Sequence, residues 1–211
     1  MALTRLNNNA YGETISVAKG GTGVTTSAAL ANLGHRTLLN STTVSSDVAQ
    51  IAIDNTILTS DIRHLEIIVG DYIPSTTHGH LGFLASINNG SSFATHLRAR
   101  AYTNRFESNT PGWTIDGNVA EGYFIDDVKG GSLDGLNGGC GSVRIYNIQG
   151  GSTKIAVTES YTRNSHNSGY YAYWGVSSIR TTSAINYIKL FDNAESGNIS
   201  GGRFDFYGYK N

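Results

Sequence analysis

VAKGGTGVTTSAALANLG, residues 17–34, divides the chain into a short polar leader and a long body patterned as β-strands. Glycines in its first half permit turns and positive φ angles. Thr26 is a suitable helix N-cap, and the residues after it can form two helical turns before Gly34, where a C′ glycine is common. The apolar positions of this short helix form one stripe: Ala29, Leu30 and Leu33. Because a helix of about 12 Å is marginal alone in water, we expect the stripe to pack against sister chains.

The part of this stretch that reads AKGGTGVTTSAALANLG resembles the connector of many bacteriophage tail-fibre and related virion proteins, in which a GGTG turn precedes a short Ala/Leu/Asn-rich helix. Residues 185–209, INYIKLFDNAESGNISGGRFDFYGY, are similar to the closing strands of the β-sandwich module at the end of many phage fibres. The resemblance implies a homotrimeric fibre protein. Residues 1–35 would form an extended attachment arm that ends in the helix, and residues 36–211 an antiparallel, jelly-roll-like β-sandwich.

The body itself predicts an all-β domain, because ten or eleven short strand-like runs alternate with turn signals. Turns are expected at 71–77 and 109–112, and Asp116-Gly117 is expected to separate two short strands. Hairpins are predicted at Asn88-Asn89-Gly90 and at Gly150-Gly151. No repeat of fixed period is visible, which argues against a solenoid or a propeller.

Composition narrows the class of partner. Only 15% of the 211 residues are charged and the formal net charge is −1, so neither nucleic acid nor an anionic membrane is expected as the main partner. Cys140 is the single cysteine, which excludes an intrachain disulfide. The N-terminus lacks an apolar signal core and no run is long enough for a membrane helix, so we expect assembly in a host cytoplasm and exposure on a virion.

An aromatic run provides the main candidate ligand site: Tyr170, Tyr171, Tyr173 and Trp174. Trp113, beside a turn, is a further candidate. Ring faces can pack on the C–H surfaces of a sugar while hydroxyl and indole groups form hydrogen bonds. The alternative for these residues is packing in the core and at a subunit interface.

Two groups of basic side chains have weaker functional alternatives. His78 and His80 share a face of a strand, so three copies could offer six imidazoles to a metal, although two solvated histidines in a turn are the simpler interpretation. We therefore expect no metal and no cofactor. His96, Arg98 and Arg100 form a basic stripe, which we interpret as a solvated strand face unless it contacts an acidic partner.

No pattern for catalysis stands out. The carboxylates are scattered, no nucleophile motif occurs, and the glycines at 20–23 match neither a Walker loop nor a dinucleotide fingerprint. We expect a non-enzymatic phage tail-fibre component that binds a host-cell glycan or protein and joins other virion proteins through residues 1–35. The alternative is a structural virion protein without receptor binding, such as a head fibre, a capsid decoration protein or a tail adaptor.

Overall fold

The computed structural model describes residues 36–76, 78–104, 108–129, 138–163, 170–193 and 197–210. These residues form an all-β structure, and none of them lies in a helix that could cross a membrane. The expected arm and connector helix, with Ala29, Leu30 and Leu33, lie outside the described residues.

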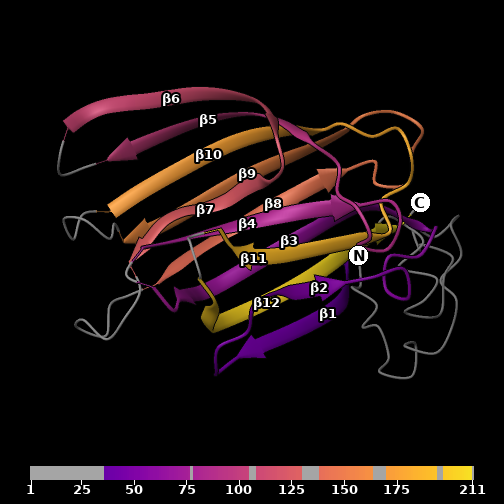
Figure 1. Ribbon diagram of the computed structural model, residues 1–211, viewed down its shortest axis with the longest axis horizontal. Helices are drawn as coiled ribbons and strands as arrows, with labels where there is room; N and C mark the ends of the chain where they lie inside the picture. The colour runs from indigo at the N-terminus through magenta and orange to yellow at the C-terminus, as the bar shows by residue number, and fades with distance from the viewer. Residues whose placement is uncertain are drawn as a thin grey trace, which may run out of the picture.

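Twelve strands make up the described part: β1 (Arg36–Val44), β2 (Ile51–Ile53), β3 (Ile62–Pro74), β4 (His78–Ser86), β5 (His96–Asn104), β6 (Ser108–Val119), β7 (Gly122–Lys129), β8 (Gly139–Tyr146), β9 (Lys154–Arg163), β10 (Tyr170–Ile179), β11 (Tyr187–Asp192) and β12 (Ile199–Lys210). They form an eight-stranded sheet in the order β1-β12-β3-β8-β9-β10-β5-β6 and a four-stranded sheet in the order β2-β11-β4-β7 (Figure 1). All strand pairs are antiparallel.

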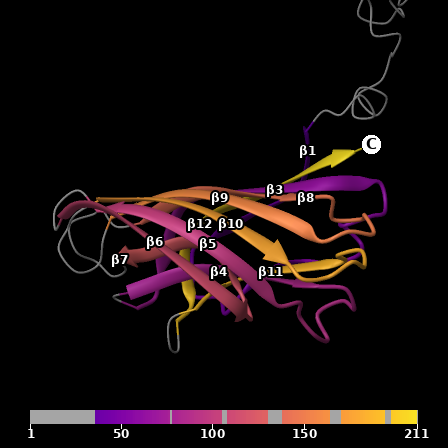
Figure 2. The same ribbon diagram turned by 90° about the horizontal axis from the view of Figure 1, so that it is seen from above.

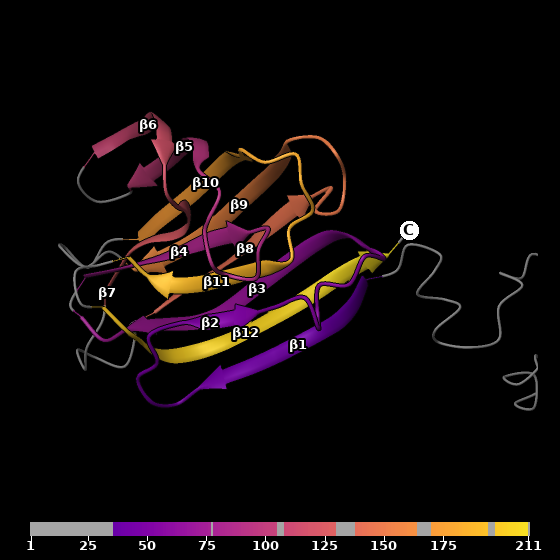
Figure 3. The ribbon, with the colours of Figure 1, turned by 45° about the vertical axis from the view of Figure 1, so that its right-hand side comes forward.

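The pairing is nested from the ends of the chain inward. β1 pairs with β12, β2 with β11, β3 with β8 and β4 with β7. The two remaining pairs, β5–β6 and β9–β10, widen the larger sheet beyond β8. β6 and β1 therefore lie at its two opposite edges (Figure 3).

The core lies between the two sheets, which Figure 2 shows as two layers. Alternate residues of the central strands point into it, and each large apolar side chain buried there contributes about 1.5–3 kcal/mol relative to exposure. Its largest fully buried apolar side chains include Phe83, Phe124, Phe204, Phe206 and Leu65. The four-stranded sheet covers the middle of the larger one, with β7 packed against β8 and β9.

The antiparallel pairing assigns the connections to two ends of the sandwich. Arg36 pairs with Tyr209, so the arm joins the domain beside the last residues of β12. At this near end lie the links β2–β3, β4–β5, β6–β7, β8–β9 and β10–β11. At the opposite, far end the strands β1, β3, β5, β7, β9 and β11 end, and β2, β4, β6, β8, β10 and β12 begin (Figure 1).

Two of the three turn predictions were wrong, and the one at 71–77 is confirmed only in its last part, where Ser75 and Thr76 bend between β3 and β4. The other turn signals are absorbed into long strands. β3 continues through Asp71 to Pro74, and the positive φ of Asp71 (54°) accompanies a register shift against β8 instead of a reversal. β6 runs without a break through both 109–112 and Asp116-Gly117. It is an edge strand, where proline and glycine are tolerated.

The two hairpin predictions had different outcomes. Gly150-Gly151 does lie in the turn between paired strands β8 and β9, which confirms that hairpin. The Asn88-Asn89-Gly90 stretch does turn, with positive φ at Asn89 and Gly90, but it links β4 of the smaller sheet to β5 of the larger one. A turn signal specifies a reversal, whereas which strands pair depends on the whole sheet.

Candidate functional site

Strand β9 places its apolar side chains outward. The outward residues include Ile155, Val157 and Tyr161, which are 40%, 42% and 53% exposed. Its inward residues are small or polar and nevertheless buried: Lys154, Ala156, Thr158, Ser160 and Thr162. An amphipathic strand ordinarily turns its apolar side to the core. β9 has the inverse arrangement, because its apolar side points away from the smaller sheet that covers the core.

Lys154 shows how a polar side chain is accommodated on the inward side. Its Nζ donates to the carbonyl oxygens of Gly150 (2.6 Å) and Ser152 (2.9 Å) in the β8–β9 turn. Burial lowers the pKa of this ammonium group. The buried lysine thus keeps hydrogen-bond acceptors for its charge in the half-buried and exposed residues of the turn, and it ties that turn to the inward side of β9.

The outward side chains of β9 continue those of its neighbours. In one cross-strand row, Ile115 of β6 pairs with Ala99, then Val176 of β10, Val157 of β9 and finally Arg144 of β8. Eight large side chains of these five strands are 37–64% exposed: Leu97, Ile115, Tyr146, Ile155, Val157, Tyr161, Trp174 and Val176. We call this surface the outer apolar face.

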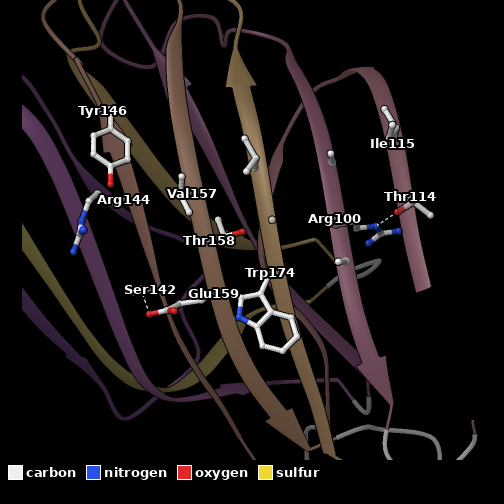
Figure 4. A pocket seen from close by; sticks show the side chains of 14 residues that line it. Arg100, Thr114, Ile115, Ser142, Arg144, Tyr146, Val157, Thr158, Glu159 and Trp174 are labelled. Atoms are coloured by element: carbon white, nitrogen blue, oxygen red, sulfur yellow. Dashed lines mark hydrogen bonds between the residues drawn. The ribbon is translucent and has the colours of Figure 1, made fainter. Parts of the chain in front are cut away.

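A groove of about 540 Å³ crosses the outer apolar face. Trp174 projects into its middle, as Figure 4 shows. The Tyr161 ring meets the Trp174 ring edge-on, with 6.5 Å between centroids. Such a groove offers an aromatic platform surrounded by aliphatic side chains, with few polar groups for orientation.

Two charged side chains on the outward side of the sheet border the groove: Glu159 of β9 and Arg144 of β8 (Figure 4). On the β8 side, Glu159 accepts a hydrogen bond from Ser142 Oγ at 3.2 Å. Arg100 directs its guanidinium toward the smaller sheet instead: its Nε donates to Thr114 Oγ1 at 2.6 Å, and its Cζ lies 5.3 Å from the centroid of the Tyr123 ring of β7. The groove therefore combines an anion and a cation with its apolar lining and has no strong charge of one sign.

The rest of the outward side of the larger sheet, over β3, β12 and β1, is mostly polar, although Leu38 of β1 is 49% exposed there. Glu66 lies at the centre of this part. Its carboxylate accepts from Arg36 (2.9 Å), Arg144 (2.5 Å) and the Tyr209 hydroxyl (2.9 Å). Arg36 also lies over the Tyr207 ring, 4.1 Å from its centroid. We call Glu66, Arg36, Arg144 and Tyr209 the Glu66 network.

The Glu66 network fixes the charge of its members. Burial alone would raise the pKa of Glu66, but the hydrogen bonds from Arg144, Arg36 and Tyr209 outweigh it and the pKa is lowered. The hydrogen bond to Glu66 in turn raises the pKa of Arg144. Arg144 also lines the groove, so it marks the boundary between the polar and apolar parts of the sheet surface.

The aromatic candidates do not form one site. Trp174 lines the groove, whereas Tyr173 points inward and is 3% exposed, so it presents no surface to an external ligand. Tyr171 is half-buried near the far end of β10. Trp113 and Tyr170 lie on strands β6 and β10, but their side chains fall outside the described part.

The histidine pair lies at the start of β4 in the smaller sheet. His78 begins β4 opposite Lys129, and the His80 ring lies 6.1 Å from the Tyr123 ring. Among the described residues, no group of three or more His, Cys, Asp or Glu could hold a metal ion.

The expected solvated face of His96, Arg98 and Arg100 was wrong, because this side of β5 faces the smaller sheet. His96 is buried and hydrogen-bonded to Ser177 Oγ (2.9 Å). Arg98 stacks on Tyr123 at 3.8 Å and pairs with Asp116 at 2.8 Å.

Sequence reasoning missed the aliphatic part of the groove. The alternation of Ile155, Val157 and Tyr161 is visible in the sequence, but alternation alone does not say which side of a strand meets the core. The polar inward partners, above all Lys154, were the available signal.

Comparison with known proteins adds no relative: no family model, no curated protein and no solved structure matches this chain.

Proposed function

We propose that this chain is a non-enzymatic component of a bacteriophage tail fibre, exposed on the virion surface and homotrimeric. Its arm, residues 1–35, attaches it to tail, baseplate or capsid proteins, and its β-sandwich binds a host-cell glycan or protein. The observation that carries this proposal is the separation of the two ends: Arg36 joins the arm at the near end, whereas β1, β3, β5, β7, β9 and β11 all end at the far end. A protein held at one end can recognise a partner with the other.

We further propose a jelly-roll-like topology, preceded by the short connector helix with Ala29, Leu30 and Leu33. The nested pairing of β1 with β12, β2 with β11, β3 with β8 and β4 with β7 supports it, since a long hairpin rolled into two sheets produces this order. On this interpretation β5–β6 and β9–β10 are insertions that widen one sheet.

Recognition at the far end suits a binding protein better than an enzyme. Loops on a rigid β-scaffold commonly carry binding residues, and Tyr170 and Tyr171 begin β10 at that end. Two described carboxylates have other partners: Glu66 is held by arginines, and the hydrogen bond from Arg98 lowers the pKa of Asp116. Three weak sites per trimer would raise avidity by orders of magnitude without a strong single site.

The test is competition for adsorption. Purified chain should reduce adsorption of phage particles to host cells, and a Gly-Ser-Asp-Gly-Ser insertion between His166 and Asn167, in the β9–β10 link, should abolish the effect. The same insertion between Gly150 and Gly151, in the near-end β8–β9 turn, is the matched control and should leave competition intact. Equal loss or equal retention in both variants would contradict recognition at the far end.

A structural virion protein without receptor binding is the second candidate, and the outer apolar face favours it, because aliphatic surfaces suit stable protein contacts. Immunogold labelling of intact particles with antibody against residues 36–211 separates the two. Label at the tail or baseplate supports receptor binding, whereas label scattered over the head supports decoration or head-fibre function.

A further inference from the structure

Resting on the trimer proposed above, we infer that the outer apolar face is its subunit interface: it packs against a second copy of this chain. The interface would consist of the outward side chains of β8, β9, β10, β5 and β6, with Val157, Val176 and Trp174 near its centre. The far end then stays free for recognition.

The inversion of β9 is the first reason. A strand whose inward side chains are Lys154, Thr158 and Ser160 gains little from the core of its own sheet pair. Its apolar side is instead outward, where Val157 faces Val176 across the strand pair. Burying that side in an assembly removes apolar surface from water, which the single chain leaves exposed.

The extent of the face is the second reason. Eight large side chains between 37% and 64% exposed form a contiguous surface over five strands. Together they present several hundred Å², on the order of the ~800 Å² per partner that a stable protein interface buries. A single sugar ring would cover Trp174 and leave the aliphatic side chains in water.

The distribution of charge identifies a second copy as the occupant. Arg144 and Glu159 lie on neighbouring strands of the same face, so the surface carries one cation and one anion beside an apolar centre. In a trimer related by a threefold axis, two different parts of the face meet at each interface, so Arg144 of one copy can meet Glu159 of the next. In its described residues, this surface has no excess of one charge that would complement a strongly acidic or strongly basic partner.

The position of the arm supports the same occupant. Arg36, the first described residue, lies on the outward side of the same sheet and shares Glu66 with Arg144, which borders the groove. In the trimer proposed above, tethering through residues 1–35 raises the effective concentration of the three sandwiches, at which a modest surface associates.

The test measures whether the face is covered in the purified full-length chain, where copies of the chain are the only protein present. In a Cys140→Ser background, Val176→Cys is compared with Thr43→Cys, an exposed position on β1 at the opposite edge of the sheet. A bulky maleimide reagent reports accessibility, and native mass spectrometry reports the number of copies. We expect a trimer in which Val176→Cys reacts at least tenfold more slowly than Thr43→Cys, and both rates should converge on dilution to monomer.

Four results would overturn the inference. Equal reaction rates in an assembled trimer would place the interface elsewhere while leaving the proposed fibre function intact. Slow reaction of Val176→Cys in a monomer would show that the chain's own arm covers the face. A monomeric mass at all concentrations would remove the trimer itself. If Val176→Cys reacts slowly only after a neutral or charged oligosaccharide is added, the groove would be assigned to a glycan.

Discussion

The outward side of the larger sheet has two unlike parts. Over β3, β12 and β1 it is mostly polar, with Leu38 as an exposed apolar exception, and the buried Glu66 carboxylate has three partners within the same chain. Over β8, β9, β10, β5 and β6 it is apolar, and Trp174 remains 43% exposed. The first part is complete in one chain. The second becomes complete only when another surface covers it, so the comparison separates what stabilises the fold from what assembles it.

Removing Glu66 should have the largest effect on the polar part. We expect Glu66→Ala to lower the free energy of unfolding by about 3 kcal/mol, because it leaves Arg36 and Arg144 as adjacent like charges and removes the acceptor of Tyr209. Thermal or urea unfolding measures the change. Asp205→Ala, at a neighbouring outward position of β12, is the control and should cost clearly less; equal costs would contradict the special role of Glu66.

Acidification should lower the free energy of unfolding through the buried side chain of His96. Burial, with a smaller contribution from Arg98, lowers the pKa of His96 from 6.5 to about 4. The unfolded chain therefore takes up the proton first, and His96 should cost about 2.5 kcal/mol of stability as the pH falls from above 6.5 to 4.5.

Glu66 should respond at lower pH than His96. Its lowered pKa means that its contribution is present above about pH 4.5 and is lost as the pH falls through the folded value. Urea unfolding at each pH tests both groups. In His96→Leu the decline between pH 6.5 and 4.5 should shrink, and an unchanged decline would show that other groups cause it.

Replacing the inward lysine of β9 should have a smaller effect. Lys154→Met keeps the aliphatic stem but leaves the carbonyl groups of Gly150 and Ser152 without their charged donor. We expect a loss of about 2 kcal/mol in the free energy of unfolding. Hydrogen exchange should locate the loosening at the β8–β9 turn, and faster exchange spread evenly over both sheets would argue against this role.

Polar replacement on the outer apolar face should have the smallest effect on folding. Val157→Thr should change the unfolding free energy of the dissociated chain by less than about 0.5 kcal/mol, because Val157 is 42% exposed there. The same replacement at buried Val143 of β8 should cost several times more. Native mass spectrometry should show that Val157→Thr lowers the trimer fraction of a chain that is still folded. Val143→Thr should lower it only because the chain unfolds. This outcome would assign assembly to the outward side of the sheet and folding to the inward side.

The sequence predicts the fold class because alternation is a local property. Runs such as 63–69 and 153–161 show the period of strands, and Gly150-Gly151 correctly predicts a hairpin. The pairing of β1 with β12 spans nearly the whole domain, so no local signal specifies it.

The candidate site was less accessible to prediction, for the same physical reason. A period of two gives two sides to every strand but does not say which one meets the core. Tyr173 and Trp174 are neighbours in the chain and lie on opposite sides of the sheet. The basic stripe failed similarly, because Arg98 finds Tyr123 and Asp116 only in the folded domain.

The most direct measurement of the central claim is the solvent exposure of Trp174 in the assembled protein. In the full-length Trp113→Phe variant, Trp174 is the only tryptophan, and acrylamide quenching of its fluorescence reports access of solvent to the outer apolar face. We predict blue-shifted emission and weak quenching in the trimer, with exposure appearing on dilution to monomer. Emission and quenching typical of an exposed indole in the intact trimer would contradict the claim that copies of the chain cover this face.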